Sequence, residues 1–190
     1  MFFPGNDKQF ARLSHYNWYL AVLSTEPPGV RQPSKKITIM VWKPHTTVAA
    51  IIERDDKFLM VEELIQGEQV INKPAGHLDP DDSLIEAVIR ETREETAWQF
   101  IPEAITGIYL WKNPDNGESF LRFAFCGSCK NHKASQALDE GIQAAIWKTR
   151  DELMQQQQKL RSPMVMQNIE DYLSGQRYPL DILSTVDYEQ

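Results

Sequence analysis

The chain has 190 residues, a formal net charge of −7, 42% hydrophobic residues and 25% charged residues. This length and composition are typical of one soluble globular domain with a short appendage. The acidic surplus argues against binding a nucleic-acid backbone and is compatible with a site that collects cations through carboxylates. The 2 cysteines argue against a secreted fold that is stabilised by disulfides. Without a membrane-spanning apolar run or a signal peptide, we expect a cytoplasmic protein.

The first 39 residues differ from the rest of the chain. They contain loop-forming prolines, among them Pro27, Pro28 and Pro33, and one candidate short helix at 10–23. We interpret residues 1–39 as a loosely structured leader or as the product of a wrongly assigned start. Residues 40–183 are then the folded domain, and residues 184–190 are a C-terminal tail.

Five segments carry the apolar or alternating pattern of β-strands. The first two are joined by the turn Asp55-Asp56, which predicts a hairpin. The five predicted strands are 46–53, 57–64, 107–112, 119–126 and 143–148.

Three helices are predicted from their capping signals. Ser83 and Thr149 are each followed three residues later by glutamate, which is the pattern of a capping box. Ser162 with Pro163 predicts the start of a third helix, which should end before Gly175. Strands interspersed with helices indicate an α/β fold in which a mixed sheet lies between helices.

The segment 76–98 contains the best candidate for chemistry. When residues 83–96 are placed on a helix, Glu91, Glu94 and Glu95 fall within an arc of about 100° that borders the apolar face. Three carboxylates therefore point the same way, at the edge of the buried side. The alternative is an ordinary solvated helix whose charges form ion pairs four residues apart.

The spacing of the whole segment favours a functional cluster. It resembles the Nudix box, G-x5-E-x7-R-E-U-x-E-E-x-G-U, in which U is a bulky aliphatic residue. The chain therefore resembles the Nudix hydrolases, which implies a Nudix-type α/β/α sandwich with a loop–helix–loop that carries the box. The box residues are Gly76, Arg90, Glu91, Glu94 and Glu95, with Asp82 where the first glutamate is expected.

Three box positions depart from the pattern. Asp82 keeps the charge and shortens its reach by one methylene, and Thr92 replaces an aliphatic residue. Ala97 replaces the second glycine, so we expect a slightly different turn after the helix. Because all three helix glutamates remain, these changes bear on metal affinity more than on the reaction.

Beyond the box, residues 40–183 resemble bacterial phosphatase-type Nudix enzymes that act on hydroxymethylpyrimidine pyrophosphate, thiamine pyrophosphate and nucleoside di- and triphosphates. The resemblance implies hydrolysis of a terminal phosphoanhydride bond with release of phosphate. Chains of this group begin near the equivalent of Met40. The resemblance therefore also favours the interpretation that the start upstream of Met40 is one that the cell does not use. The matching stretches are Lys43-Pro44-His45, residues 72–78, residues 120–123, residues 160–163 and residues 174–180.

Two other functions stay open. A Nudix pyrophosphatase would cut an internal bond of a nucleotide-sugar or dinucleotide and release a nucleoside monophosphate. A non-catalytic Nudix-fold module would bind nucleotides without turnover, although such modules usually lose box glutamates. In each case the expected partner is a small-molecule pyrophosphate, with no nucleic acid and no membrane, and we expect a monomer.

The glutamates of the box are the predicted metal ligands and part of the catalytic set. Glu91, Glu94 and Glu95 suit a hard divalent cation, Mg²⁺ or alternatively Mn²⁺, which would neutralise phosphate charge and orient a water. Arg90 is expected to hold one of these carboxylates in place. The general base is Glu94, Glu95 or an acid from the loop at Asp139-Glu140, where Nudix enzymes often carry an extra acid. For that loop, a simple polar turn is the alternative.

Four further residues are candidates for substrate binding. Lys73, His77 and Arg122 could bind phosphate, and Trp111 could stack on a planar ring. Each also has an ordinary structural alternative. Trp111 could belong to the core, His77 could stabilise a turn, and Arg122 could be a charge on an edge strand.

Overall fold

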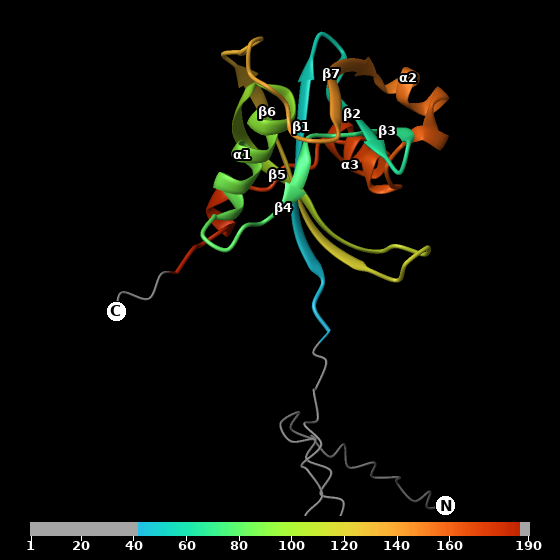
Figure 1. The fold of residues 1–190 in the computed structure, drawn as a ribbon. Coiled ribbons are helices and arrows are strands. Elements are labelled where there is room, and N and C mark those ends of the chain that lie inside the picture. Colours follow the sequence, from blue (N-terminus) through green and yellow to red (C-terminus); the bar gives the residue numbers. More distant parts are fainter. Residues whose placement is uncertain (1–41, 187–190) are drawn as a thin grey trace, which may run out of the picture. The chain divides into compact units, whose positions relative to one another are not determined.

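The protein is described by a computed structural model that covers residues 42–186 (Figure 1). These residues belong to one compact unit, Val41–Gln190. The predicted leader and its candidate helix at 10–23 lie outside the described residues, as does the end of the predicted tail. Within residues 42–186, no helix is both long and apolar enough to cross a membrane.

A mixed sheet forms the centre of the domain (Figure 1). Its main path has the order β3-β2-β1-β6-β5, with β4 paired to β1 and β7 paired to β2. β1 runs parallel to β6, and its pairings with β2 and β4 are antiparallel. The strands are β1 (His45–Arg54), β2 (Lys57–Ile65), β3 (Glu68–Asn72), β4 (Ala75–His77), β5 (Gln99–Lys112), β6 (Ser119–Lys130) and β7 (Ile142–Thr149).

The predicted helices are present, and two of their three starts are as expected. Capping boxes begin α1 (Leu84–Thr96) at Ser83 and α2 (Arg150–Gln155) at Thr149. The predicted Ser162 cap is wrong, because α3 (Met164–Leu173) follows Pro163 without a side-chain cap. Short 3₁₀ turns lie at Gln157–Lys159 and Leu180–Ile182.

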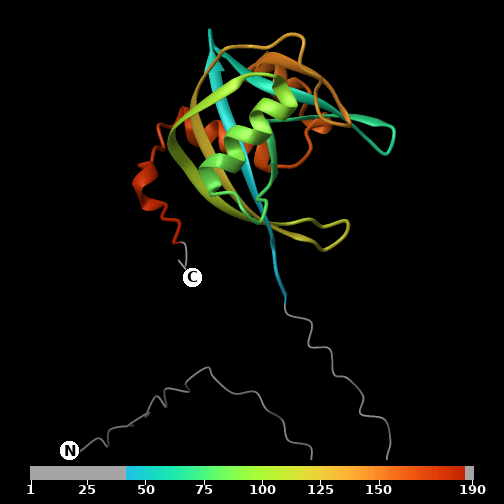
Figure 2. The ribbon, with the colours of Figure 1, turned by 60° about the vertical axis from the view of Figure 1, so that its left-hand side comes forward.

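The two faces of the sheet form separate hydrophobic cores, because side chains alternate along each strand. On β1, Val48 and Ala50 face one core, and Ile51 faces the other. Helix α1 closes the first core with Val88, and α3 closes the second with Ile169. Figure 2 shows α1 lying across one face of the sheet. The predicted α/β/α sandwich with a mixed sheet is therefore confirmed.

Three strand segments were not predicted from the sequence. β3 and β4 are short, and β5 begins at Gln99 rather than at residue 107. Register shifts interrupt the β5–β6 pairing near Pro102 and again between Ile105 and Gly107. These irregularities break the two-residue alternation by which strands are recognised in a sequence.

Candidate active site

The box segment forms the expected loop–helix–loop between β4 and β5. Gly76 lies on β4 opposite Val48 of β1, which brings this strand against α1. A Cβ atom at Gly76 would collide with the carboxylate of Glu91. Glycine at this position therefore leaves the space that the carboxylate of Glu91 occupies beside the strand.

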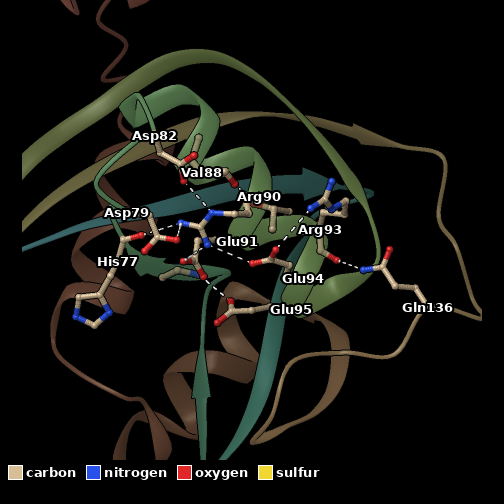
Figure 3. Close-up of polar contacts among 12 residues, drawn as sticks. His77, Asp79, Asp82, Val88, Arg90, Glu91, Arg93, Glu94, Glu95 and Gln136 are labelled. Atoms are coloured by element: carbon tan, nitrogen blue, oxygen red, sulfur yellow. Dashed lines mark hydrogen bonds and ion pairs between the residues drawn. The ribbon is translucent and has the colours of Figure 1, made fainter. Parts of the chain in front are cut away.

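Arg90 joins the box carboxylates to one another (Figure 3). Its Nε donates to Asp82 at 2.8 Å, and its Nη1 donates to Glu91 at 2.8 Å and to Glu94 at 3.2 Å. Its Nη2 donates to the carbonyl of His77 at 3.1 Å. The expected role of Arg90 in holding box carboxylates is present in the structure. Asp82 serves as one of its anchors, for which the shorter aspartate has sufficient reach.

The end of α1 differs from the expectation at Ala97. This residue adopts the left-handed conformation, with φ 58° and ψ 10°, and its N–H caps the carbonyl of Arg93. Glycine adopts this conformation most easily, yet alanine takes it here. The predicted change of turn at this position is therefore wrong.

Glu95 is the most buried of the three helix glutamates. Its Oε2 accepts a hydrogen bond of 2.9 Å from the backbone N–H of Ala75. Burial, with the negative charges of Glu63, Glu91 and Asp139, raises the pKa of Glu95 to about 9. Burial also raises the pKa of Glu91. The cluster is thus short of positive charge, which a bound cation would supply.

The donor set fits a hard divalent cation, although it is not preassembled. Within residues 42–186, no three acidic, histidine or cysteine side chains form a ready metal cage. Arg90 accounts for this, because it holds Glu91 and Glu94 through hydrogen bonds. Carboxylate oxygens are the ligands that Mg²⁺ and Mn²⁺ prefer. Glu91, Glu94 and Glu95 could hold such an ion after a small change of their rotamers.

A cleft of about 500 Å³ opens beside Glu95 and brings three of the four predicted substrate-binding residues together: His77, Trp111 and Arg122. Arg122 is only 8% exposed. Its Nε donates to Thr47 at 3.2 Å, and its Nη1 has no partner in the described part of the chain. Burial lowers the pKa of Arg122 to about 10. A buried guanidinium nitrogen without a partner is suited to bind an anion.

The structure does not bring Lys73 to this cleft. Its side chain is 1% exposed, and its Nζ lies 3.4 Å from the carbonyl oxygen of Met164. Burial lowers its pKa well below the usual lysine value. Lys73 therefore lies against the start of α3 and is not among the residues that line the cleft.

The acids of the loop before β7 lie near the box. Asp139 and Glu140 line a smaller cleft of about 210 Å³ together with Glu63 and Glu95. The backbone N–H of Asp139 donates to the carbonyl of Glu94 at 3.1 Å, which ties the loop to α1. Both predicted loop acids are thus within the region of the carboxylate cluster.

Glu63 is a site residue that the sequence analysis missed. It lies on β2 and lines both clefts with Glu95. Its Oε1 is buried without a partner, and its Oε2 lies 3.8 Å from Nε of Arg161. The available signal was the pair Glu62-Glu63, which interrupts an otherwise apolar strand. Polar residues inside a buried strand usually need a partner or a ligand.

Comparison with known proteins agrees with this fold and site. The NUDIX domain family matches residues 43–168, which is more than half of the chain. The chain belongs to the Nudix family, and its fold and box are those of a Nudix hydrolase.

Among individual relatives, the chain is similar to proteins named as phosphatases. The chain is 41% identical over 143 residues to Phosphatase NudJ of Escherichia coli K12, covering 75% of this chain and 92% of that protein. The same values hold for Phosphatase NudJ of Shigella flexneri. A NUDIX hydrolase structure from Nitrosomonas europaea is 50% identical, with a TM-score of 0.75, covering 76% of this chain and 98% of that one.

A more distant structure supports the fold alone. The NUDIX domain of Shewanella oneidensis NrtR, complexed with ADP ribose, has a TM-score of 0.58 and 18% identity. The alignment covers 71% of this chain and 90% of that domain.

Proposed function

We propose that this Nudix hydrolase removes the terminal phosphate from small pyrophosphorylated metabolites. The proposed substrates are thiamine pyrophosphate, its precursor hydroxymethylpyrimidine pyrophosphate, and nucleoside di- and triphosphates. The observation that supports this most directly is that Arg122 and Glu95 line one cleft, and that Nη1 of Arg122 is buried without a partner within residues 42–186. The 41% identity to a phosphatase supports the same reaction.

The carboxylates of the box are the proposed ligands of a divalent cation. Glu91, Glu94 and Glu95 would hold Mg²⁺ or Mn²⁺, which supplies charge neutralisation and a more acidic water. Arg90 keeps two of these carboxylates oriented through its Nη1 atom. Since neighbouring carboxylates raise the pKa of Glu91 and of Glu95, binding a cation would also offset the repulsion among these charges.

The remaining residues bind and orient the substrate. Arg122 donates to a phosphate oxygen through its free Nη1, while Thr47 fixes its Nε. Trp111, which stacks on Phe120 at 5.7 Å, offers a face for a planar ring. Water attacks the terminal phosphorus, the bond to the bridging oxygen breaks, and orthophosphate leaves. Glu94, Glu95 or Glu140 accepts the proton of that water.

A phosphate-release assay with Mg²⁺ over these metabolites tests the proposal. We expect orthophosphate and the compound shortened by one phosphate, with Glu94→Gln as the inactive control. A nucleotide-sugar and a dinucleotide belong in the same panel, and release of a nucleoside monophosphate from these two without orthophosphate would favour the internal-bond alternative. Tight binding of the metabolites by the wild type without any turnover would favour a non-catalytic module.

A further inference from the structure

Four side chains that line the cleft beside Glu95 each have a buried polar atom without a partner within residues 42–186. They come from four separate segments: β2, β3, β6 and the loop before α3. Buried polar atoms are nearly always paired, so such a group is unusual unless a ligand or ordered water completes it. The unpaired atoms that line this cleft are Glu63 Oε1, Asn72 Oδ1, Arg122 Nη1 and Ser162 Oγ.

Two of these groups are hydrogen-bond donors, and a second cation, Arg161, lies beside one of them. Arg122 supplies a guanidinium nitrogen, and Ser162, only 8% exposed, supplies a hydroxyl. Arg161 is adjacent to Ser162, and its backbone N–H donates to Ile71 at 2.9 Å, which fixes this loop to β3. The positive charge of Arg161 contributes to lowering the pKa of Arg122. The two guanidiniums therefore repel each other, and an anion between them would relieve that repulsion.

Arg161 also keeps free donors of its own. Among residues 42–186 it makes one ion pair, a 3.8 Å contact from its Nε to Glu63, and its side chain is 49% exposed. The N-terminal end of α3 lies at the same wall, because Ser162 and Met164 both line the cleft. Unpaired N–H groups at the start of a helix add to the attraction for a phosphate.

A larger cleft of about 710 Å³ continues from this place. The residues that it shares with the cleft beside Glu95 are Trp111, Asn113, Asp115, Arg161 and Ser162. Its further walls include apolar side chains: Met154, Leu160, Pro163 and Met166. The boundary between the two clefts therefore carries the guanidinium of Arg161 as well as the carboxylate of Asp115, and the space beyond it is partly apolar and large enough for an organic group.

We propose that Arg161 and Ser162, with Arg122, form a second phosphate subsite for the phosphate that stays on the leaving group. The organic part of the substrate then extends past Trp111 into the larger cleft. This inference rests on the proposed function, because it places the transferred phosphate at the box carboxylates. The subsite implies that the loop before α3 contributes to substrate specificity.

Steady-state kinetics of Arg161→Gln on a nucleoside diphosphate test the subsite. We expect KM to rise roughly tenfold or more, because a charge-assisted hydrogen bond is lost, while kcat changes less than about threefold. Arg161→Lys should restore part of the affinity, and Ser162→Ala should raise KM by a smaller factor. Lys130→Gln is the matched control, since it removes an exposed cation from the far end of β6.

Calorimetric binding of inorganic pyrophosphate to the same variants gives a readout without turnover. The subsite predicts weaker binding by Arg161→Gln and unchanged binding by Lys130→Gln. Equal KM and equal pyrophosphate affinity in these two variants would overturn it. The wild type could release no orthophosphate while the Arg161→Gln variant binds pyrophosphate more weakly than the wild type. In that case the subsite stands and the proposed reaction fails.

Discussion

Nη1 of Arg90 lies 2.8 Å from Oε1 of Glu91, so an arginine side chain holds one of the proposed metal ligands directly. Arg90→Lys keeps the charge and loses the fork that reaches several acceptors at once. We expect the apparent Mg²⁺ affinity to fall roughly tenfold or more, with a smaller loss of kcat at saturating Mg²⁺. Activity measured as a function of Mg²⁺ concentration separates the two effects.

Arg177→Lys is the matched control for this substitution. Arg177 stacks on Tyr172 at 3.9 Å and donates to backbone carbonyls, away from the box. It should leave the Mg²⁺ dependence unchanged. An Arg90→Lys enzyme with the Mg²⁺ response of the control would show that Arg90 does not support the metal site.

Gly76→Ala should damage the site without unfolding the domain. The added methyl group meets the flexible end of Glu91 rather than the backbone, so the carboxylate moves while the strand stays. We expect a loss of kcat of roughly tenfold or more, with a melting temperature close to that of the wild type. Gly175→Ala is a useful contrast. Gly175 has φ 86° and open space around it, so this change should lower stability and leave kcat intact.

Glu95→Gln should have opposite effects on activity and on stability at alkaline pH. It removes a proposed metal ligand, so kcat should fall about a hundredfold. The pKa of Glu95 is raised to about 9 by burial and neighbouring acids, whereas an unfolded glutamate titrates near ~4.3. Between these values the folded state binds more protons than the unfolded state. The metal-free wild type should therefore lose stability as pH rises through this range.

Urea unfolding without metal at about pH 5 and about pH 8.5 checks this sign. The fall in stability between the two conditions should be smaller in Glu95→Gln than in the wild type. Added Mg²⁺ should also reduce the fall in the wild type, because a cation favours the ionised carboxylate. Equal pH dependence in the two metal-free proteins would contradict the raised pKa.

The two loop acids can be separated by paired substitutions. Asp139 adds to the raised pKa of both Glu91 and Glu95, and Glu140 is not among the causes for either residue. We expect Asp139→Asn to lower kcat more than Glu140→Gln, and to shift the acidic limb of the pH–rate profile. A larger loss of kcat in Glu140→Gln would assign the role of general base to Glu140, which is one of the residues predicted for that role.

A chain that begins at Met40 should keep full phosphatase activity. The described strands, both cores and the cleft residues all belong to residues 45–186, and the NUDIX domain match begins at residue 43. The measurement compares kcat, KM and melting temperature of the shortened and full chains. Loss of activity or of cooperative unfolding in the shortened chain would place residues 1–39 in the core or the site.

Local patterns explain which parts were predictable from the sequence. The capping box at Ser83, the hairpin turn at Asp55-Asp56 and the arc of box glutamates each depend on residues within one short segment. Such signals can be recognised in the sequence without knowledge of the tertiary structure. They were sufficient to predict the start of α1, the hairpin and the shared arc of the glutamates, whereas the loop–helix–loop was implied by the resemblance to the Nudix box.

The missed features depend on contacts between distant segments. Glu63 belongs to the site because β2 lies beside the loop of Asp139, and this pairing has no local signal. Lys73 was a candidate for phosphate binding, but it lies between β3 and β4 with its side chain buried, and its Nζ lies against the carbonyl of Met164. Ser162 carries the pattern of a helix cap, whereas its hydroxyl lines the cleft.

The parallel pairing of β1 with β6 has a consequence for synthesis. It brings Thr47 to Arg122, 75 residues apart, so this contact requires most of the chain to have been translated. Arg161 and the start of α3 come later still. A ribosome-arrested product that ends before residue 160 would contain the complete Nudix box at 76–98 and the Thr47–Arg122 contact. It would lack the wall that closes the cleft, so recognition of the box in a gene fragment does not imply an active enzyme.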